Sequence, residues 1–276
     1  MDASFFDEYT SHDAIRKYTK ATAGYGISYL LDHDYKSVYL KALELLPGSV
    51  KTKGLRILEF GCGGGMNLVH LVSVLKQSGI KFVSAVGTDF SPVLIEAAKR
   101  EVSSYLPPED RGKLTFHVGR NESLTQDIST ASGVDRSQLR NSFDFILGVN
   151  TIRYCHRFDR EMDCAREIYA LLAPGGVCVN IDMNDRFPAF RSDLKNKFRA
   201  VKEEECYIPS LTEYAAPFEK TGFEMVRKEN FCWIPHSGGK VTCAVLGGLT
   251  PVLNAVAPTR AMRSLVVVRK PGGTSK

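Results

Sequence analysis

The sequence predicts an α/β protein built on a doubly wound, Rossmann-like sheet with helices on both faces. Three observations support this fold class. From Leu55 onward, short apolar runs alternate with longer amphipathic stretches, which is typical of strands joined by helices. The first apolar run leads into a turn with four glycines, Gly61-Cys62-Gly63-Gly64-Gly65. The 276 residues, 43% hydrophobic and 24% charged, also match one large globular domain.

Five apolar runs predict central strands that are parallel and buried, because helices separate them. In chain order they are 55–60, 81–90, 113–119, 143–150 and 177–184. Helices are predicted at 67–78, from Ser91-Pro92 to 101, and at 160–172 before Pro174-Gly175-Gly176. A helix at 210–222 and strands at 223–231 and 263–270 complete the pattern. Ligands of such sheets bind at the carboxyl ends of the strands.

The chain is expected to divide into a helical N-terminal lid and a ligand-binding domain. The boundary is predicted near Pro47-Gly48, giving a lid of residues 1–50 and a domain of residues 51–276. Two segments, 186–209 and 232–262, depart from the alternating pattern. The second is too long for a hairpin loop, so we expect it to wall a binding site or form a homodimer contact.

Composition and charge exclude several classes of protein. No apolar run is long enough to span a membrane, and the N-terminus lacks a basic segment before an apolar one. The sequence therefore predicts a cytoplasmic protein with no membrane partner. The net charge of +5 is scattered, which argues against a nucleic-acid partner. Seven cysteines include no CxxC pair, so neither a disulfide framework nor a metal site is expected.

The glycine-rich turn predicts close approach of a ligand to the backbone. A dinucleotide site in this position prefers GxGxxG, which places the pyrophosphate at the start of a helix. Here Gly61, Gly63 and Gly65 give GxGxG, and Glu59 precedes them. A carboxylate at this strand end repels a phosphate but suits an ammonium group. The turn therefore favours a ligand with an amino group over a pyrophosphate.

A second mark lies at the end of the following strand, where Asp89 and Phe90 stand. A carboxylate there is placed to accept both hydroxyls of a ribose, and Phe90 is placed against an adenine ring. The alternative for Asp89 is a solvated acid at a strand end. Together with the glycines, these residues predict an adenosine-containing ligand.

The sequence resembles the class I S-adenosylmethionine-dependent methyltransferases. The resemblance rests on ILEFGCGGG, VGTDFSPVLIEAAK, SFDFILGVNTIRY and LLAPGGV, which together span roughly residues 55–182. It implies a seven-stranded mixed sheet whose last strand is antiparallel. It also implies that S-adenosylmethionine is the cofactor, with S-adenosylhomocysteine as product. The residues implied to hold the methionine part are Glu59, Gly61, Gly63 and Gly65, with Asp89 at the ribose and Phe90 at the adenine.

The stretch after the third strand departs from the family pattern. Members of the family commonly carry an acid there that contacts the adenine amino group, but Arg120 stands in its place. That contact is expected to pass to Asn121 or Glu122, and Asn121 is predicted to bind the cofactor. The alternative is that Asn121 only closes a turn.

The end of the fourth strand is where the family resemblance places the reactive methyl group. Asn150, Tyr154 and His156 follow that strand and are the predicted catalytic residues, with Asn150 also contacting the cofactor. Histidine suits proton removal from an acceptor near neutral pH. An aromatic face such as that of Tyr154 stabilises a cation. Both side chains have structural alternatives, as a surface residue and as a packing residue.

Arginines near the same strand ends favour an anionic or polar acceptor. They are Arg153, Arg157, Arg160, Arg186 and Arg191. The alternative is that they pair with nearby acids, of which Asp159, Asp163, Asp182 and Asp185 are the candidates. Asp182, Asn184 and Asp185 are expected to orient an acceptor or to cap a helix.

The N-terminal lid carries a predicted face of Tyr18, Thr22, Tyr25 and Tyr29. This face is expected either to pack on the core or to close over the cofactor, and Tyr25 is predicted to contact it.

These observations predict methyl transfer to an oxygen or nitrogen of a small acceptor that is polar or anionic, a specialised metabolite. The main alternative is attack at the aminocarboxypropyl carbon of the same cofactor, for example an intramolecular cyclisation that releases methylthioadenosine. A non-catalytic S-adenosylmethionine-binding protein and an NAD-dependent oxidoreductase are further alternatives.

Overall fold

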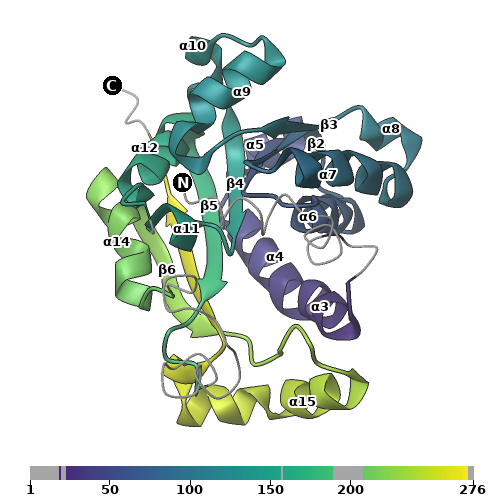
Figure 1. Ribbon diagram of the computed structural model, residues 1–276, viewed down its shortest axis with the longest axis vertical. Coiled ribbons are helices and arrows are strands. Elements are labelled where there is room, and N and C mark those ends of the chain that lie inside the picture. Colours follow the sequence, from purple (N-terminus) through teal and green to yellow (C-terminus); the bar gives the residue numbers. More distant parts are fainter. Residues whose placement is uncertain (1–18, 20–22, 157, 189–207, 273–276) are drawn as a thin grey trace.

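A computed structural model describes residue 19 and residues 23–156, 158–188 and 208–272 (Figure 1). Its centre is a seven-stranded sheet in the order β3-β2-β1-β4-β5-β7-β6. The strands are β1 (Leu55–Phe60), β2 (Phe82–Asp89), β3 (Leu114–Val118), β4 (Phe143–Val149), β5 (Leu172–Met183), β6 (Glu224–Phe231) and β7 (Arg263–Arg269). Only β7 runs antiparallel to its neighbours in this sheet. The predicted mixed sheet with an antiparallel last strand is confirmed.

Helices cover both faces of the sheet (Figure 1). One face is covered by α3 (Tyr25–Leu30), η2 (Leu31–Tyr35), α4 (Lys36–Glu44), α6 (Met66–Gln77) and α7 (Pro92–Tyr105). The other face is covered by α9 (Leu124–Ser132), α10 (Arg136–Leu139), α11 (Ile152–His156), α12 (Glu161–Leu171) and α14 (Leu211–Thr221). Alternate residues of β1 supply both cores, with Ile57 on the first side and Leu58 on the second.

The remaining helices lie outside these two layers. They are α5 (Gly48–Lys53), α8 (Pro108–Arg111), η3 (Asn121–Ser123), α15 (Lys240–Val256) and η6 (Pro258–Arg260). The helix is interrupted at Pro47, because α4 ends at Glu44 and Pro47 is the N-cap of α5, whereas the division into lid and domain stays a prediction. Segment 232–262, predicted as an insertion, contains a helix of 17 residues. No helix in the described ranges combines the length and apolar character needed to cross a membrane.

One predicted boundary is wrong. Pro174-Gly175-Gly176 was expected to separate the helix from the fifth strand, but β5 already begins at Leu172. The pairing of β4 with β5 shifts register between Phe143 and Phe145, which accommodates the extra residues. The proline and glycines therefore form an irregular first part of the strand.

Candidate functional site

The glycine loop joins β1 to α6 at the carboxyl edge of the sheet. Gly61, Gly63 and Gly65 have backbone φ values of 61°, 53° and 80°, which residues other than glycine rarely adopt. A Cβ on Gly61 would lie 2.1 Å from Oγ1 of Thr151, the residue two positions beyond β4. Glycine is therefore required at position 61 both by backbone conformation and by space.

Glu59 lies beneath this loop and is fully buried. Both of its carboxylate oxygens lack a hydrogen-bond partner among the described residues. Burial raises the pKa of Glu59 well above its usual value, although the Asn67 side chain and the Leu68 N–H act in the opposite direction. The hydroxyl of Tyr39, which is electrostatically coupled to Glu59, is also buried without a partner. An unpaired buried carboxylate is costly, so this position suits a cationic group of a ligand.

Asp89 closes the loop from the neighbouring strand. Its two carboxylate oxygens accept hydrogen bonds of 2.9 Å each from the N–H groups of Gly63 and Ser91. Burial raises the pKa of Asp89 to about 6, despite these two hydrogen bonds. Each oxygen retains lone-pair capacity, so the carboxylate can accept further hydroxyl donors. Phe90 follows it and is half-buried.

Asn121 is brought to the same edge, where its Nδ2 donates to Oγ1 of Thr151 over 2.6 Å. An acid of α9, Asp127, contacts the turn that contains Arg120. Asp127 accepts hydrogen bonds from the Arg120 N–H at 2.8 Å and from the Ser123 hydroxyl at 2.7 Å. These two hydrogen bonds fix the turn that follows β3 against α9.

Asn150 and Tyr154 follow β4, as predicted. Asn150 has a φ of 54°, and its N–H donates to the Ile181 carbonyl over 2.7 Å. The Tyr154 hydroxyl accepts a 2.7 Å hydrogen bond from Arg153, whose guanidinium lies 4.7 Å from the centroid of the same ring. His156 is the last residue of α11, and its side chain is outside the described part of the structure.

Sequence reasoning missed Arg263, the first residue of β7. It pairs with Met183 of β5 and Phe231 of β6, so it lies at the carboxyl edge of the sheet. Its side chain is 1% exposed. One Nη donates to Oδ1 of Asn150 at 3.5 Å and the other contacts Nε2 of His236 at 2.5 Å.

The Arg263 guanidinium lacks a carboxylate partner within 4.0 Å in the described ranges, and its Nε has no hydrogen-bond partner. Burial, with the charges of Arg263 and Arg153, lowers the pKa of His236 to about 3. His236 is therefore neutral, and its Nε2 accepts a hydrogen bond from the guanidinium, which can only donate. The sequence offered no local signal, since an arginine at the start of an apolar strand is ordinarily exposed.

Several predicted arginines pair within the protein. The N–H of Arg153 donates to Asp182 at 3.4 Å, and its Nε lies 3.7 Å from the same carboxylate. Arg160 pairs with Asp163 at 3.1 Å on the surface of α12. For these two, the ion-pair alternative is confirmed.

The other predicted polar residues are spread around this edge. Arg186 is exposed, and Asn184 donates to the carbonyls of Thr259 and Ala261, tying β5 to η6. Asp185 carries a buried oxygen without a partner in the described ranges. Arg157 and Arg191 lie outside the described residues.

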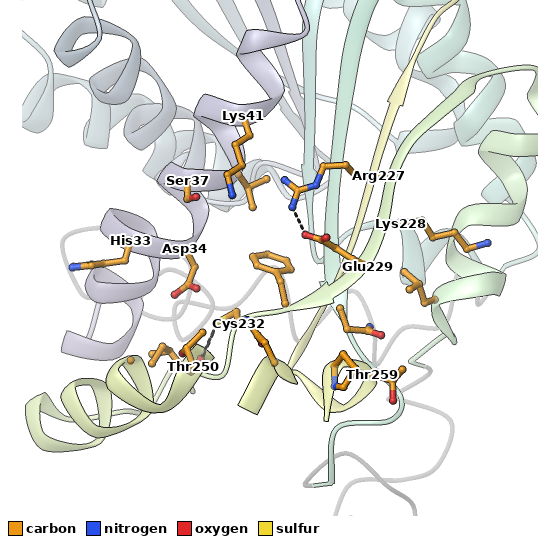
Figure 2. Close-up of a pocket in the computed structure, with 18 of the residues that line it drawn as sticks. His33, Asp34, Ser37, Lys41, Arg227, Lys228, Glu229, Cys232, Thr250 and Thr259 are labelled. Carbon is orange, nitrogen blue, oxygen red and sulfur yellow. Dashed lines mark hydrogen bonds and ion pairs between the residues drawn. The ribbon is translucent and has the colours of Figure 1, made fainter. Parts of the chain in front are cut away.

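A pocket of about 800 Å³ lies between the N-terminal helices, β6 and α15 (Figure 2). Asp34, Ser37 and Lys41 project into it from η2 and α4 and Thr250 from α15, whereas the His33 side chain points away from the other labelled residues. On the strand side, Arg227 and Glu229 of β6 form an ion pair. The volume is in the range of small-molecule sites.

Aromatic rings connect this pocket with the glycine loop. The Phe231 ring lines the pocket and lies 6.2 Å from that of Tyr35, which lies 6.2 Å from that of Tyr39. The Tyr39 hydroxyl responds to the charge of Glu59. The pocket and the loop are therefore joined through two buried tyrosines.

Tyr29 also lines the pocket, whereas Tyr25 is 45% exposed. The ring of Tyr25 contacts that of Tyr29 and lies 6.0 Å from Nζ of Lys240 on α15. The structure therefore does not bring Tyr25 together with the glycine loop, and its contact with a cofactor stays a prediction. Tyr18 and Thr22 lie outside the described residues.

Comparison with known proteins decides among the ligands that this edge could bind. A family model described as a methyltransferase domain matches residues 31–228. The chain belongs to the class I S-adenosylmethionine-dependent methyltransferases. The chain is similar to a magnesium-protoporphyrin O-methyltransferase of Rhodobacter capsulatus, with 41% identical residues over 66 aligned positions. These positions cover 24% of this chain and 25% of the relative. The match thus spans about a quarter of that curated relative.

Solved structures show the same methyltransferase fold. An S-adenosylmethionine-dependent methyltransferase from Mesorhizobium loti is 17% identical, with a TM-score of 0.53 over 83% of this chain and 95% of the other. A phosphoethanolamine N-methyltransferase from Haemonchus contortus, in complex with S-adenosylmethionine, is 18% identical. It has a TM-score of 0.54 over 85% of this chain and 52% of that one.

S-adenosylmethionine is therefore the cofactor, and the dinucleotide alternative is set aside. The loop of this methyltransferase fits that group, since Glu59 is an unpartnered buried carboxylate beside a glycine turn at the carboxyl edge of the sheet. The aminocarboxypropyl alternative is not favoured, because the matching family and the curated relative are methyltransferases.

Proposed function

We propose that this methyltransferase transfers a methyl group to an oxygen or nitrogen atom of a small anionic metabolite. The observation that carries the proposal is Arg263, a guanidinium that is 1% exposed and has no carboxylate partner in the described part of the chain. Leaving a buried charge unpaired costs several kcal/mol, on the order of 3–5, so an anionic group of the acceptor would compensate it. The relative's name, an O-methyltransferase, favours oxygen as the acceptor atom.

We also propose which residues at this edge bind the cofactor. We assign the methionine part of S-adenosylmethionine to Glu59 and the glycine loop, and its ribose to Asp89. Phe90 and Asn121 are assigned to the adenine side, and Asn150 to the reactive end. When bound, S-adenosylmethionine supplies an electrophilic methyl group. The protein's part is to hold acceptor and cofactor in line and to exclude water.

Each residue at the reactive edge has a separate task in this proposal. Asn150 and His236 hold the guanidinium of Arg263 toward the acceptor through hydrogen bonds at its two Nη atoms. Tyr154 borders the same edge, with its hydroxyl fixed by Arg153. His156 is assigned as the base that takes the acceptor proton, since α11 begins directly after the edge.

The N-terminal helices and segment 232–262 form the acceptor side in this proposal. Their support is the pocket of about 800 Å³, whose walls come from α3 to α4, β6 and α15. The lid of residues 1–50 and the domain of residues 51–276 thus meet at the acceptor.

A comparison of charged acceptors with their neutral esters tests this function. Purified protein and S-adenosylmethionine are incubated with a panel of small hydroxy and amino acids and with the methyl ester of each, and S-adenosylhomocysteine is measured. We expect turnover of free acids and at least a tenfold higher acceptor KM for Arg263→Gln, with Arg263→Lys less affected. The stabilisation of each variant by S-adenosylhomocysteine should equal that of the wild type.

Turnover of the neutral esters with equal kcat/KM would contradict an anionic acceptor. An unchanged acceptor KM in Arg263→Gln would do the same. Formation of methylthioadenosine without any acceptor would contradict methyl transfer itself.

A further inference from the structure

Helix α15 exposes a continuous face of apolar residues. Val241, Val245, Leu249, Val252 and Val256 recur at intervals of three and four residues, so they share one face of the helix. All five are exposed, from 46% for Leu249 to 77% for Val241. The opposite face carries Thr250 and Asn254, which line the internal pocket. A surface helix normally has the reverse arrangement.

The helix is weakly held by the rest of the protein. Cys243 is its one buried residue. Figure 1 shows α15 along one end of the molecule, with α3 on its inner side. Its sequence includes Gly247, Gly248 and Pro251, which are poor helix formers in water. The described contacts therefore leave most of its apolar surface uncovered, which indicates a further binding surface.

Charge around α15 is of one sign. Residues 241–259 contain no charged side chain, and the exposed cations Lys240 and Arg260 stand at the two ends. After Glu229 the sequence contains no aspartate or glutamate, but six lysines and arginines. An apolar surface bounded by cations is complementary to an anionic lipid bilayer.

Two aromatic residues lie beside α15, one near each end of the helix. Tyr25 is 45% exposed and lies beside Lys240, and Nε1 of Trp233 donates to Asn254 of α15 over 2.8 Å. Tyrosine and tryptophan side chains favour the boundary between lipid and water, because they combine an apolar ring with a polar group.

A second copy of the chain fits this face less well. A two-fold contact between two α15 helices would bring Lys240 of one copy near Arg260 or Lys240 of the other, and like charges oppose such a contact. The exposed apolar face also lacks the aromatic and arginine anchors typical of protein interfaces.

We propose that α15 binds peripherally to an anionic lipid bilayer, with its apolar face in the interface and Lys240 and Arg260 at the headgroups. This goes beyond the methyl transfer proposed above. The sequence predicted no membrane partner because it lacks a spanning segment, and that argument does not apply to a helix lying on the surface.

Vesicle flotation of the full-length protein tests the proposal. Vesicles of phosphatidylcholine are compared with vesicles that also contain phosphatidylglycerol. The protein should float with the anionic vesicles, and Val245→Glu/Leu249→Glu should lower the bound fraction at least tenfold. Lys240→Gln and Arg260→Gln should each weaken binding about fivefold, and added salt should weaken it further.

Val134→Glu is the matched control, because Val134 is an exposed apolar residue in a loop far along the chain from α15. It should float like the wild type. The stabilisation of each variant by S-adenosylhomocysteine shows that it is folded. Absence of flotation with both vesicle types would overturn the proposal. So would a dimer, seen by sedimentation velocity, that the Val245→Glu/Leu249→Glu variant dissociates while vesicle binding is unchanged.

Discussion

The carboxyl edge of the sheet around the glycine loop, called the glycine-loop edge below, and helix α15 depart in opposite ways from the usual distribution of polar and apolar groups. At the edge, Glu59 and Arg263 are ionisable side chains that are buried and have no ion pair within 4.0 Å in the described ranges. On α15, Val241 and Val256 are apolar side chains that are 77% and 73% exposed. Each environment costs free energy that a complementary ligand would recover.

The difference between the two regions indicates what kind of ligand each one needs. The edge is enclosed and offers individual charges at fixed positions, which suits small molecules such as the cofactor and an anionic acceptor. Helix α15 offers an extended surface without hydrogen-bonding groups, which suits a bilayer. If this comparison is correct, substitutions in one region should leave the ligand of the other region bound.

The largest effect is expected from Gly61→Ala. The new Cβ would lie 2.1 Å from Oγ1 of Thr151, at a backbone φ of 61°. Steric overlap and backbone strain together should lower the free energy of unfolding by about 3 kcal/mol or more. Binding of S-adenosylhomocysteine, measured by calorimetry, should fall below detection.

Gly133→Ala is the matched control for this prediction. Gly133 has a similar φ of 73°, but a Cβ there would meet no atom within 4 Å. It should cost only about 1 kcal/mol and leave ligand binding unchanged. Equal effects of the two substitutions would show that the loop has room for a side chain at position 61, against the geometry described above.

The contrast between the two regions also explains how much the sequence could predict. Glu59, the glycines and Asp89 belong to a local pattern of strand, turn and helix, so their positions could be predicted from spacing alone. Arg263 reaches the same edge only because β7 inserts antiparallel between β5 and β6. That pairing joins residues far apart in the chain, so no local pattern reports it.

The sequence also could not predict which face of α15 is buried. The pattern of α15 identifies one apolar face, and by default that face would be assigned to the core. Tertiary packing instead places Thr250 and Asn254 against the pocket and leaves the valines outside. The contact of Asp127 with the turn after β3 is likewise tertiary, since this residue reaches the turn from α9.

An intermediate effect with a characteristic pH dependence is expected for Glu59→Gln. Burial raises the pKa of Glu59 in the folded protein, so the folded state binds this proton more tightly than the unfolded chain. The resulting stabilisation is complete below about pH 4.5 and is lost as pH rises through the folded pKa. The glutamine variant lacks this loss, so without ligand it should be more stable than the wild type at pH 8.

Ligand binding should change in the opposite direction. A neutral amide cannot pair with the ammonium group of S-adenosylhomocysteine, so we expect at least a tenfold loss of affinity for Glu59→Gln. Wild-type affinity should rise with pH as the Glu59 carboxyl ionises. Thermal unfolding and calorimetry between pH 5 and pH 8 measure both quantities. A variant that is less stable at pH 8 and binds the ligand as tightly as the wild type would contradict the assigned role of Glu59.

The smallest effect is expected from Trp233→Phe, at the junction of the two regions. The substitution keeps most of the aromatic surface but removes the 2.8 Å hydrogen bond from Nε1 to Asn254 of α15. Because this bond is exposed, its loss should lower the free energy of unfolding by at most about 1 kcal/mol. Hydrogen exchange should become faster in α15, while the affinity for S-adenosylhomocysteine stays at the wild-type value. A change in that affinity would show that α15 and the glycine-loop edge are energetically coupled, through the pocket that Phe231 and Tyr35 connect to Glu59.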